Sequence, residues 1–276
     1  MDKVKIKYKI PKPVMPTQEE LEDASAKWWD NLKDVSVHVY YDKLSQHMFP
    51  LKMVTIPDRI IKELPKVEAM KEDDRFQTMA ELQHVFGYCI SPALLQLGCS
   101  RRFFIKLMSR SPKDYLYEPN MVKPKPLTST HDALEALQCS MRTFEDLVYM
   151  MHLKGVEPYF IVQPYIDFDP KYEFRCFVVC GKVVGITQYY YDYSFDYGNT
   201  DMRGVGFDIE NVIRKVVMPR VSISTFVVDV VFFNNKWYIL ELNPYGASDP
   251  CLFHSYDNFK SNFLYNDAGV VRSSRI

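Results

Sequence analysis

Two carboxylates and one amide side chain interrupt two neighbouring apolar segments of this chain. Asp229 lies within residues 225–233, and Glu241 and Asn243 lie within residues 237–243. A carboxylate in an apolar strand is costly unless it is paired or binds a metal ion. Two carboxylates and an amide oxygen suit Mg²⁺, which takes one or two carboxylates and leaves its other positions to water and substrate phosphates. The pattern predicts a metal–nucleotide site, with an ordinary hairpin carrying acids at a solvated end as the alternative.

The connection between the two segments decides whether the three groups meet. Glu241 and Asn243 are two residues apart, so they point to one face of a strand. A two-residue turn at 234–235 would place Asp229 and Glu241 on opposite faces. A three-residue loop at 234–236 sets the two carboxylates directly opposite each other, and its asparagines tolerate the left-handed conformation that such a loop needs. We therefore predict the three-residue loop.

Cationic side chains elsewhere suit the phosphates of a nucleotide. Lys106 ends an apolar strand and is a candidate phosphate ligand, the alternative being a lysine at a strand edge that reaches solvent. Glu173 and Arg175 share one face of a predicted strand, and the planar fork of arginine suits phosphate oxygens. A mutual surface ion pair is the alternative for these two. The chain has no glycine-rich phosphate loop, so side-chain cations would have to hold a nucleotide's phosphates.

An extended segment at Gln163-Pro164-Tyr165 follows the apolar residues 160–162. Its backbone is suited to hydrogen bonding with the edge of an adenine, with apolar residues around the ring. Histidines are few and scattered, and no serine or cysteine has a recognisable base partner. The sequence therefore gives no support for nucleophilic catalysis.

Composition restricts the class of protein. A chain of 276 residues fits one large domain or two small lobes, and a net charge of −1 gives no reason to expect direct nucleic-acid binding. The six cysteines form no CxxC pair or zinc spacing, which favours free thiols in a reducing compartment. The N-terminus has no apolar signal region, and no segment approaches the length of a membrane span. We expect a soluble cytoplasmic protein.

The pattern of apolar residues, caps and turns predicts an α+β arrangement in which antiparallel strands dominate the C-terminal half. A capping box at Thr17 and Glu20 opens the first helix, and Gly98 closes a long one. A turn at Gly181-Lys182 joins two strands. The expected elements are an irregular arm at 1–16, helices at 17–33, 57–64, 74–97 (interrupted at 91–92), 131–139, 141–154 and 208–217, a helix or turn opened at 111–114, strands at 35–41, 102–107, 159–166, 173–180 and 183–191, and the hairpin described above.

Four blocks of this sequence resemble the cell division cycle protein 123 family, in the family's order and across roughly residues 100–256. The blocks are residues 104–107 with 111–114, 173–178 with 181–188, 226–230 with 240–246, and 249 with 252–253. The resemblance implies an ATP-grasp fold with ATP–Mg²⁺ between two lobes, here 17–158 and 159–276. It implies an assembly chaperone for eukaryotic translation initiation factor 2, which docks the gamma subunit so that the alpha and beta subunits can join.

The resemblance also assigns the site. It places Lys106 and Arg175 near the phosphates, the Gln163–Tyr165 stretch at the adenine, and the metal on Asp229, Glu241 and Asn243. The ATP-binding residues that we expect are Lys106, Lys113, Asp114, Gln163, Tyr165, Glu173, Arg175, Gln188, Asp229, Glu241 and Asn243. Family patterns are altered at 108–110, 163–164 and 189–190, so the nucleotide site is kept more closely than the surfaces that would meet a partner.

Two other functions fit the same residues. An ATP-grasp ligase would activate a carboxylate as an acyl phosphate and couple it to an amine or thiol. Its lid and the basic groups of its acceptor site could come from the loop 118–130 with Lys123 and Lys125, or from the loop 192–206 with Arg203. A plain binding module would keep the fold with a degenerate site. The assembly chaperone is the function that the resemblance favours.

Overall fold

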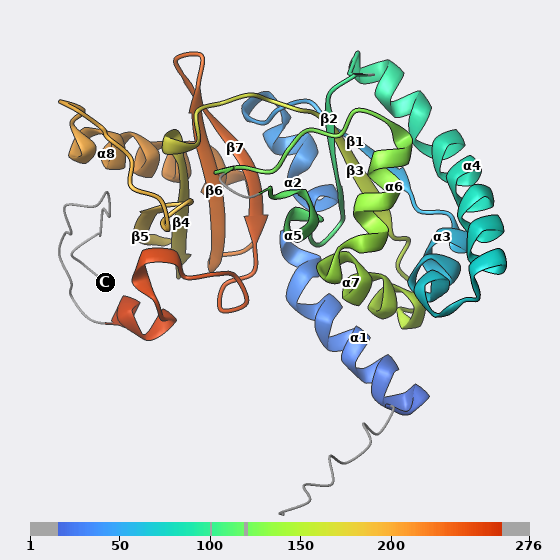
Figure 1. The fold of residues 1–276 in the computed structure, drawn as a ribbon. Coiled ribbons are helices and arrows are strands. Elements are labelled where there is room, and N and C mark those ends of the chain that lie inside the picture. Colours follow the sequence, from blue (N-terminus) through green and yellow to red (C-terminus); the bar gives the residue numbers. More distant parts are fainter. Residues whose placement is uncertain (1–15, 100, 119–120, 261–276) are drawn as a thin grey trace, which may run out of the picture.

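The computed structural model describes residues 16–99, 101–118 and 121–260, and these form two lobes, each built around an antiparallel sheet (Figure 1). The predicted α+β class is confirmed. All but the last residue of the predicted N-terminal arm lies outside the described residues. The α-helices are α1 (Gln18–Leu32), α2 (Val37–Leu44), α3 (Asp58–Glu63), α4 (Glu72–Leu97), α5 (Lys113–Leu116), α6 (Thr130–Cys139), α7 (Met141–His152) and α8 (Met202–Val212). The strands are β1 (Lys52–Thr55), β2 (Phe103–Leu107), β3 (Tyr159–Pro164), β4 (Glu173–Val179), β5 (Lys182–Gln188), β6 (Phe226–Phe233) and β7 (Lys236–Asn243).

The first lobe holds a sheet in the order β1-β3-β2, with α3, α4, α6 and α7 gathered around it (Figure 1). Its core is apolar and aromatic, and the ring of Phe86 on α4 meets Phe160 on β3 edge-on at 5.4 Å between centroids. The strand β3 begins at the predicted boundary between the lobes and pairs with β1 and β2. The division at 158/159 itself stays a prediction.

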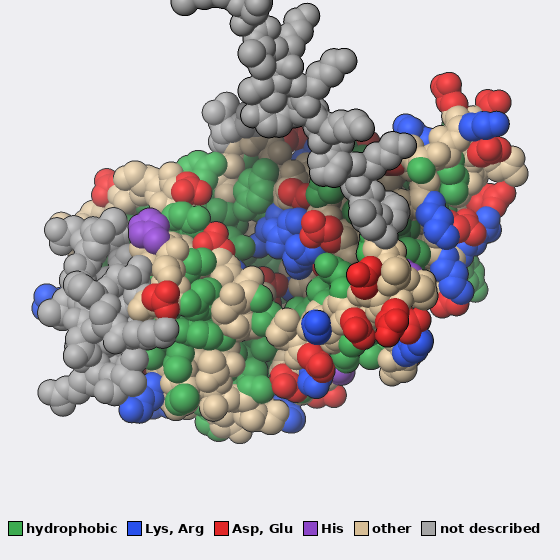
Figure 2. Space-filling view, turned by 90° about the horizontal axis from the view of Figure 1, so that it is seen from below, with side chains coloured by type: hydrophobic (Ala, Val, Ile, Leu, Met, Phe, Trp, Pro, Cys, Tyr) green, Lys and Arg blue, Asp and Glu red, His purple; other side chains and the backbone are tan. Residues whose placement is uncertain are grey.

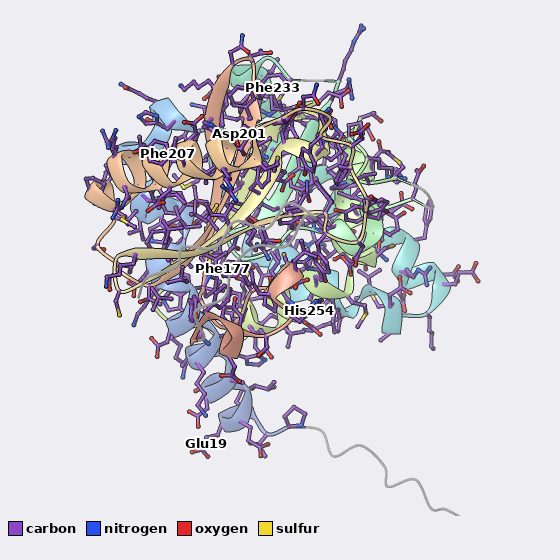
Figure 3. The ribbon with its side chains drawn as sticks, turned by 90° about the vertical axis from the view of Figure 1, so that its left-hand side faces the viewer. Glu19, Phe177, Asp201, Phe207, Phe233 and His254 are labelled. Carbon is purple, nitrogen blue, oxygen red and sulfur yellow. The ribbon has the colours of Figure 1, made fainter. Side chains whose placement is uncertain are left out.

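The second lobe holds a sheet in the order β5-β4-β6-β7. One face of β4 and β6 is apolar, and the other carries the charged residues predicted for the site. Phe177 lies on this second face beyond the charged residues, where it packs with Phe253 and Phe259 from the segment that follows β7 (Figure 3). Gly185 makes this packing possible, because a Cβ atom there would lie 2.7 Å from both of the latter rings.

The turn between β6 and β7 differs from the prediction. Phe233 pairs with Lys236, so the turn has two residues, Asn234 and Asn235, and the predicted three-residue loop is wrong. Both asparagines have positive φ, 49° and 60°. Two consecutive positive φ angles give a tight turn whose twist matches that of the strands, and asparagine tolerates this conformation better than most residues.

A β-bulge restores the pairing that the shorter turn would have lost. The register shifts between Asp229 and Val230, so that Val230 lies opposite Ile239 while Asp229 lies opposite Glu241. Leu240 is the extra residue of the bulge, so the pairing of β7 with β6 shifts by one residue beyond it. The predicted juxtaposition of the two carboxylates is therefore confirmed, although the predicted loop is not the reason for it.

The segment 35–41 was predicted as a strand, and that prediction is wrong. It forms a short 3-10 turn (η1, Lys33–Val35) followed by α2. The valines alternate, but the buried positions of α2 are Val37, Tyr40 and Leu44, which recur at helical spacing.

Three smaller boundaries also differ. α4 is continuous through Pro92, so the predicted interruption is absent. The turn between β4 and β5 is Cys180-Gly181, one residue earlier than predicted, with φ of 48° and 71°. The helix predicted from 208 begins at Met202, because the side chain of Asp201 accepts a hydrogen bond from the backbone of Arg203 and caps it. Within the described residues, no helix is both long and apolar enough to cross a membrane.

Candidate nucleotide site between the lobes

Lys106 joins the two sheets. It lies on β2 between the buried residues Ile105 and Leu107, and its ammonium group forms an ion pair with Glu241 on β7. The side chains of Lys106 and Glu241 are only 9% and 21% exposed. Burial alone would raise the pKa of Glu241, but the charges of Lys106 and Lys113 outweigh it and lower that pKa. Glu241 is therefore ionised, as a metal ligand or a partner of Lys106 must be.

Asp229 is the most heavily bonded carboxylate of the site. Its neighbour across the strands is Arg175, which donates two hydrogen bonds of 2.8 Å, one to each carboxylate oxygen. The side-chain amide of Asn243 donates a third at 3.0 Å. Burial works against the charge on Arg175, yet Asp229 raises the pKa of the guanidinium well above its usual value. The cation on Arg175 is thus paired with Asp229, and not with Glu173.

Glu173, which is buried, and Lys113, which is partly exposed, complete the charged groups of the site. Burial raises the pKa of Glu173 to about 7, against the opposing effect of Lys113. The ammonium group of Lys113 donates to the hydroxyl of Tyr189 at 2.7 Å and lies 4.6 Å from that ring's centroid. Burial would lower the pKa of Lys113, but Tyr189, Glu241 and Glu173 raise it on balance. Lys113 is charged, although the group that it bonds to is neutral.

A first cavity of about 740 Å³ lies between the sheets and reaches these charges. Of the predicted residues it is lined by Lys106, Lys113, Gln163, Tyr165, Glu173, Asp229 and Glu241. Its apolar walls include Phe104 and Phe168 near the extended end of β3. The geometry fits a flat apolar group near Gln163–Tyr165 and an anionic group at the lysines.

One charged residue of this cavity, Lys123, was predicted only for the ligase alternative and not among the ATP-binding residues. Lys123 lines it, donates to Asp167 and to the carbonyl of Phe168 at 2.6 Å each, and lies 5.6 Å from the ring centroid of Tyr165. The loop that carries it is fixed further by a hydrogen bond of 3.0 Å from the Tyr165 hydroxyl to Pro124. The proline-rich composition marked a loop that could serve a ligase, but the sequence did not indicate that its lysine contacts Asp167 and Phe168.

Two predicted site residues line neither this cavity nor the one beside it. Asp114 accepts hydrogen bonds from the hydroxyl of Ser140 at 2.5 Å and from the backbone of Arg142 at 3.3 Å, so it fixes the start of α7. Gln188 is buried and donates to the carbonyl of Pro170 at 2.8 Å. Arg175 and Asn243 line a second cavity, which adjoins the first.

The oxygen atoms of Asp229, Glu241 and Asn243 suit a hard metal ion. In the described part of the chain no three acidic, histidine or cysteine side chains form a cluster, so a metal here would rest on two carboxylates and the Asn243 amide oxygen. These are the hard oxygen ligands that Mg²⁺ takes, together with water and phosphate. Each carboxylate is bonded to a cation of the chain, Asp229 to Arg175 and Glu241 to Lys106. The residues fit Mg²⁺ provided that these cations can change partner.

Comparison with known proteins identifies the family. The family model described as D123 matches residues 63–270 of this chain. The chain belongs to the D123 family. Cell division cycle protein 123 of Eremothecium gossypii is 32% identical over 97 residues, which cover 34% of this chain and 27% of the relative. A translation initiation factor eIF2 assembly protein of Lodderomyces elongisporus is 27% identical over 190 residues, 59% of this chain and 48% of the relative.

The match to these relatives is partial in length. This D123 chain spans about a quarter to a half of the relatives that it matches. C-terminally truncated Cdc123 from Schizosaccharomyces pombe has a similar fold, with a TM-score of 0.61 at 18% identity, covering 84% of this chain and 92% of that one. The predicted resemblance to the family is confirmed, and the described fold agrees with that of a solved member.

Proposed function

We propose that this chain is an ATP–Mg²⁺-binding assembly factor that acts on translation initiation factor 2. The observation that carries the proposal is the cluster of three cations between the lobes, of which Lys106 and Arg175 are buried and Lys113 is partly exposed, facing the two carboxylates. Membership of the D123 family supports the assembly role, because relatives in it are named eIF2 assembly proteins.

Each end of the nucleotide has a fitting set of groups. The adenine would lie at the Gln163–Tyr165 segment between the rings of Phe104 and Phe168, which line the first cavity. The triphosphate would lie at the three cations, which can supply charge-assisted hydrogen bonds. Asp229, Glu241 and Asn243 would hold Mg²⁺, which when bound neutralises part of the phosphate charge.

Binding would exchange ion-pair partners and leave no charge unpaired. Lys106 and Arg175 neutralise Glu241 and Asp229 in the structure. A triphosphate offers the two cations new acceptors, while a divalent metal offers the carboxylates a new cation. Such an exchange avoids the large cost of an isolated buried charge. A site that bound ATP or Mg²⁺ separately would incur that cost. We therefore expect ATP and Mg²⁺ to bind together.

The proposed role of the nucleotide is to hold the lobes in one arrangement. Lys106 belongs to the sheet of the first lobe, whereas Arg175, Asp229 and Glu241 belong to the sheet of the second. A ligand that binds all four stabilises the arrangement in which they converge. A protein surface built from both lobes would then be complete only with nucleotide, which suits a factor that docks the gamma subunit.

The test is calorimetric titration of the full chain with ATP, with and without Mg²⁺, followed by mass analysis of the nucleotide. Purified gamma subunit is then tested for binding with and without ATP–Mg²⁺. We expect ATP binding that needs Mg²⁺, unchanged ATP after prolonged incubation, and gamma binding that is tighter with nucleotide. Absence of ATP binding would refute the proposal, and steady ADP release would replace it with a ligase.

Two variants make the titration specific. Asn243→Ala removes one proposed metal ligand and keeps both ion pairs, so it should weaken ATP binding only in the presence of Mg²⁺. Arg214→Ala is the control, because Arg214 is 63% exposed and lines neither cavity. Equal loss in both variants would contradict the metal assignment.

A further inference from the structure

A second and larger cavity, with about 2100 Å³ between its walls, opens beside the first. One wall comes from α1, α7 and the segment after β2, and the other comes from the segments that follow β5 and β7. In the view of Figure 2, basic and acidic side chains gather near the hollowed centre of the face between the lobes. Most of the residues that line it do not line the first cavity, so a nucleotide in the first cavity leaves room here for a second ligand.

Arg142 is the available cation of this cavity. In the parts of the chain that the structure describes, no acceptor is bonded to its guanidinium group. Arg110 on the same wall differs, because it bonds Asp146 through both of its carboxylate oxygens and also Glu145. The backbone of Arg142 is nevertheless held in place, since its N–H donates to Asp114 and its carbonyl accepts from Arg110 at 3.0 Å. A guanidinium on an anchored backbone with no partner of its own is suited to an anionic group of a ligand.

The rest of the lining suits a polypeptide. Trp28 and Tyr149 stack at 5.7 Å on the wall that carries Arg142, and Tyr189, Tyr191 and Tyr193 line the opposite wall. Tyrosine and tryptophan offer apolar area with a polar edge, and they are enriched where proteins bind protein segments. The exposed carboxylates of Asp192 and Asp249 also line the cavity, so a run of acidic residues would be repelled. A segment with a single acidic side chain fits both conditions.

We propose that the second cavity holds an extended segment of a partner protein, with one acidic side chain of that segment bonded to Arg142. This inference rests on the proposed function and deepens it, because it names where and by what chemistry a partner is held. The two cavities share Ser111, Lys113, Tyr190 and Glu241. A nucleotide in the first cavity therefore shapes one end of the second, and the segment binds more tightly when ATP–Mg²⁺ is present.

The experiment selects from a random heptapeptide library displayed on phage, using the full chain with ATP–Mg²⁺, the full chain alone, and Arg142→Ala with ATP–Mg²⁺. We expect the first selection to enrich peptides with one Asp or Glu at a fixed position among apolar or aromatic residues. A synthetic copy of an enriched peptide, amidated at its C-terminus, should bind Arg142→Ala at least about tenfold more weakly, as for a lost hydrogen bond to a charged group. The same peptide with Gln in place of the acid should bind the wild type with a similarly reduced affinity. Its affinity for Arg142→Ala should not be reduced further.

Arg214→Ala is the matched control, since it removes an arginine charge away from both cavities. Equal loss of peptide binding in Arg142→Ala and Arg214→Ala would overturn the proposal, as would enriched sequences without a fixed acid or a selection that enriches nothing. ATP binding is measured separately by calorimetry on each variant. If the wild type binds ATP but no peptide is selected, this inference alone is refuted. If the wild type does not bind ATP, the proposed function is refuted.

Discussion

The buried pair of Arg175 and Asp229 predicts an asymmetric response to mutation. The two side chains are 7% and 1% exposed, and each is the other's principal partner. In Asp229→Ala, the guanidinium keeps the carbonyl of Asp249 at 3.1 Å and the ring of Tyr189, but it loses the carboxylate that is bonded to it. An unpaired buried charge of this kind costs about 3–5 kcal/mol, which is about a fifth or more of the roughly 5–15 kcal/mol that stabilises an ordinary domain.

Removing both charges should cost less than removing one. The double variant Arg175→Met, Asp229→Leu leaves no buried ion, and such replacements are often neutral or better. Here the amide of Asn243 also loses its acceptor, at a cost of about 1–3 kcal/mol. We therefore expect the double variant to be more stable than Asp229→Ala, yet slightly less stable than the wild type.

Urea unfolding followed by circular dichroism and tryptophan fluorescence measures these free energies. The exposed pair of Lys154 and Glu22 provides the control, because Lys154 is 78% exposed and Lys154→Ala should change stability by less than about 1 kcal/mol. A cost for Asp229→Ala as small as that of the control, or a double variant no more stable than the single one, would refute the reasoning. A large cost also means that Asp229→Ala cannot report on metal binding alone, which is why Asn243→Ala is the better probe.

Three further changes test two residues of the site and the turn between β6 and β7. Lys106→Ala should weaken ATP binding at least about tenfold and leave adenosine binding unchanged by calorimetry, because the proposed contact of Lys106 with the nucleotide is to a phosphate. Equal losses for the two ligands would count against that contact. Burial raises the pKa of Glu173 from 4.5 to about 7, so the stability contributed by its protonated form is full below pH 4.5 and is lost as the pH rises through 7. As the pH rises from 5 to 8.5, the free energy of unfolding of Glu173→Gln should therefore increase by about 2–3 kcal/mol relative to that of the wild type, as measured by urea unfolding. A difference between the two proteins that does not change with pH would contradict the raised pKa. Asn235→Val should cost about 1–2 kcal/mol because φ is 60° at that position, whereas Asn235→Gly should not.

Charge and periodicity in the sequence predicted the centre of the site because those residues lie on regular strands. The alternation of β4, β6 and β7 put Arg175, Asp229, Glu241 and Asn243 on one face, and the structure brings them within hydrogen-bonding distance of each other or of Lys106. The turn was predicted incorrectly because a bulge leaves no trace in side-chain pattern. One extra residue in β7 compensates for one fewer in the turn. A three-residue turn without a bulge and a two-residue turn with a bulge both place Asp229 opposite Glu241.

Residues outside regular strands were harder to place. Asp114 was assigned to the site by the family resemblance alone. Its carboxylate bonds to the start of α7, and a four-residue helix has no periodicity from which that direction can be read. Lys123 reaches the first cavity through contacts with Asp167 and Phe168, which lie more than forty residues away in sequence. Such contacts depend on how the lobes pack, and that packing is a tertiary property.

The arrangement of charges explains why nucleotide and partner binding would be coupled under the proposed function. Lys113 lines both cavities and bonds only to the neutral hydroxyl of Tyr189 in the described structure. Tyr189 also lies under the guanidinium of Arg175, whose carbon is 4.8 Å from the ring centroid. If Lys113 and Arg175 turn toward a triphosphate, Tyr189 loses both cations and the wall of the second cavity that it forms must readjust. The second cavity would therefore respond to nucleotide through Tyr189 even where its ligand never touches the phosphates.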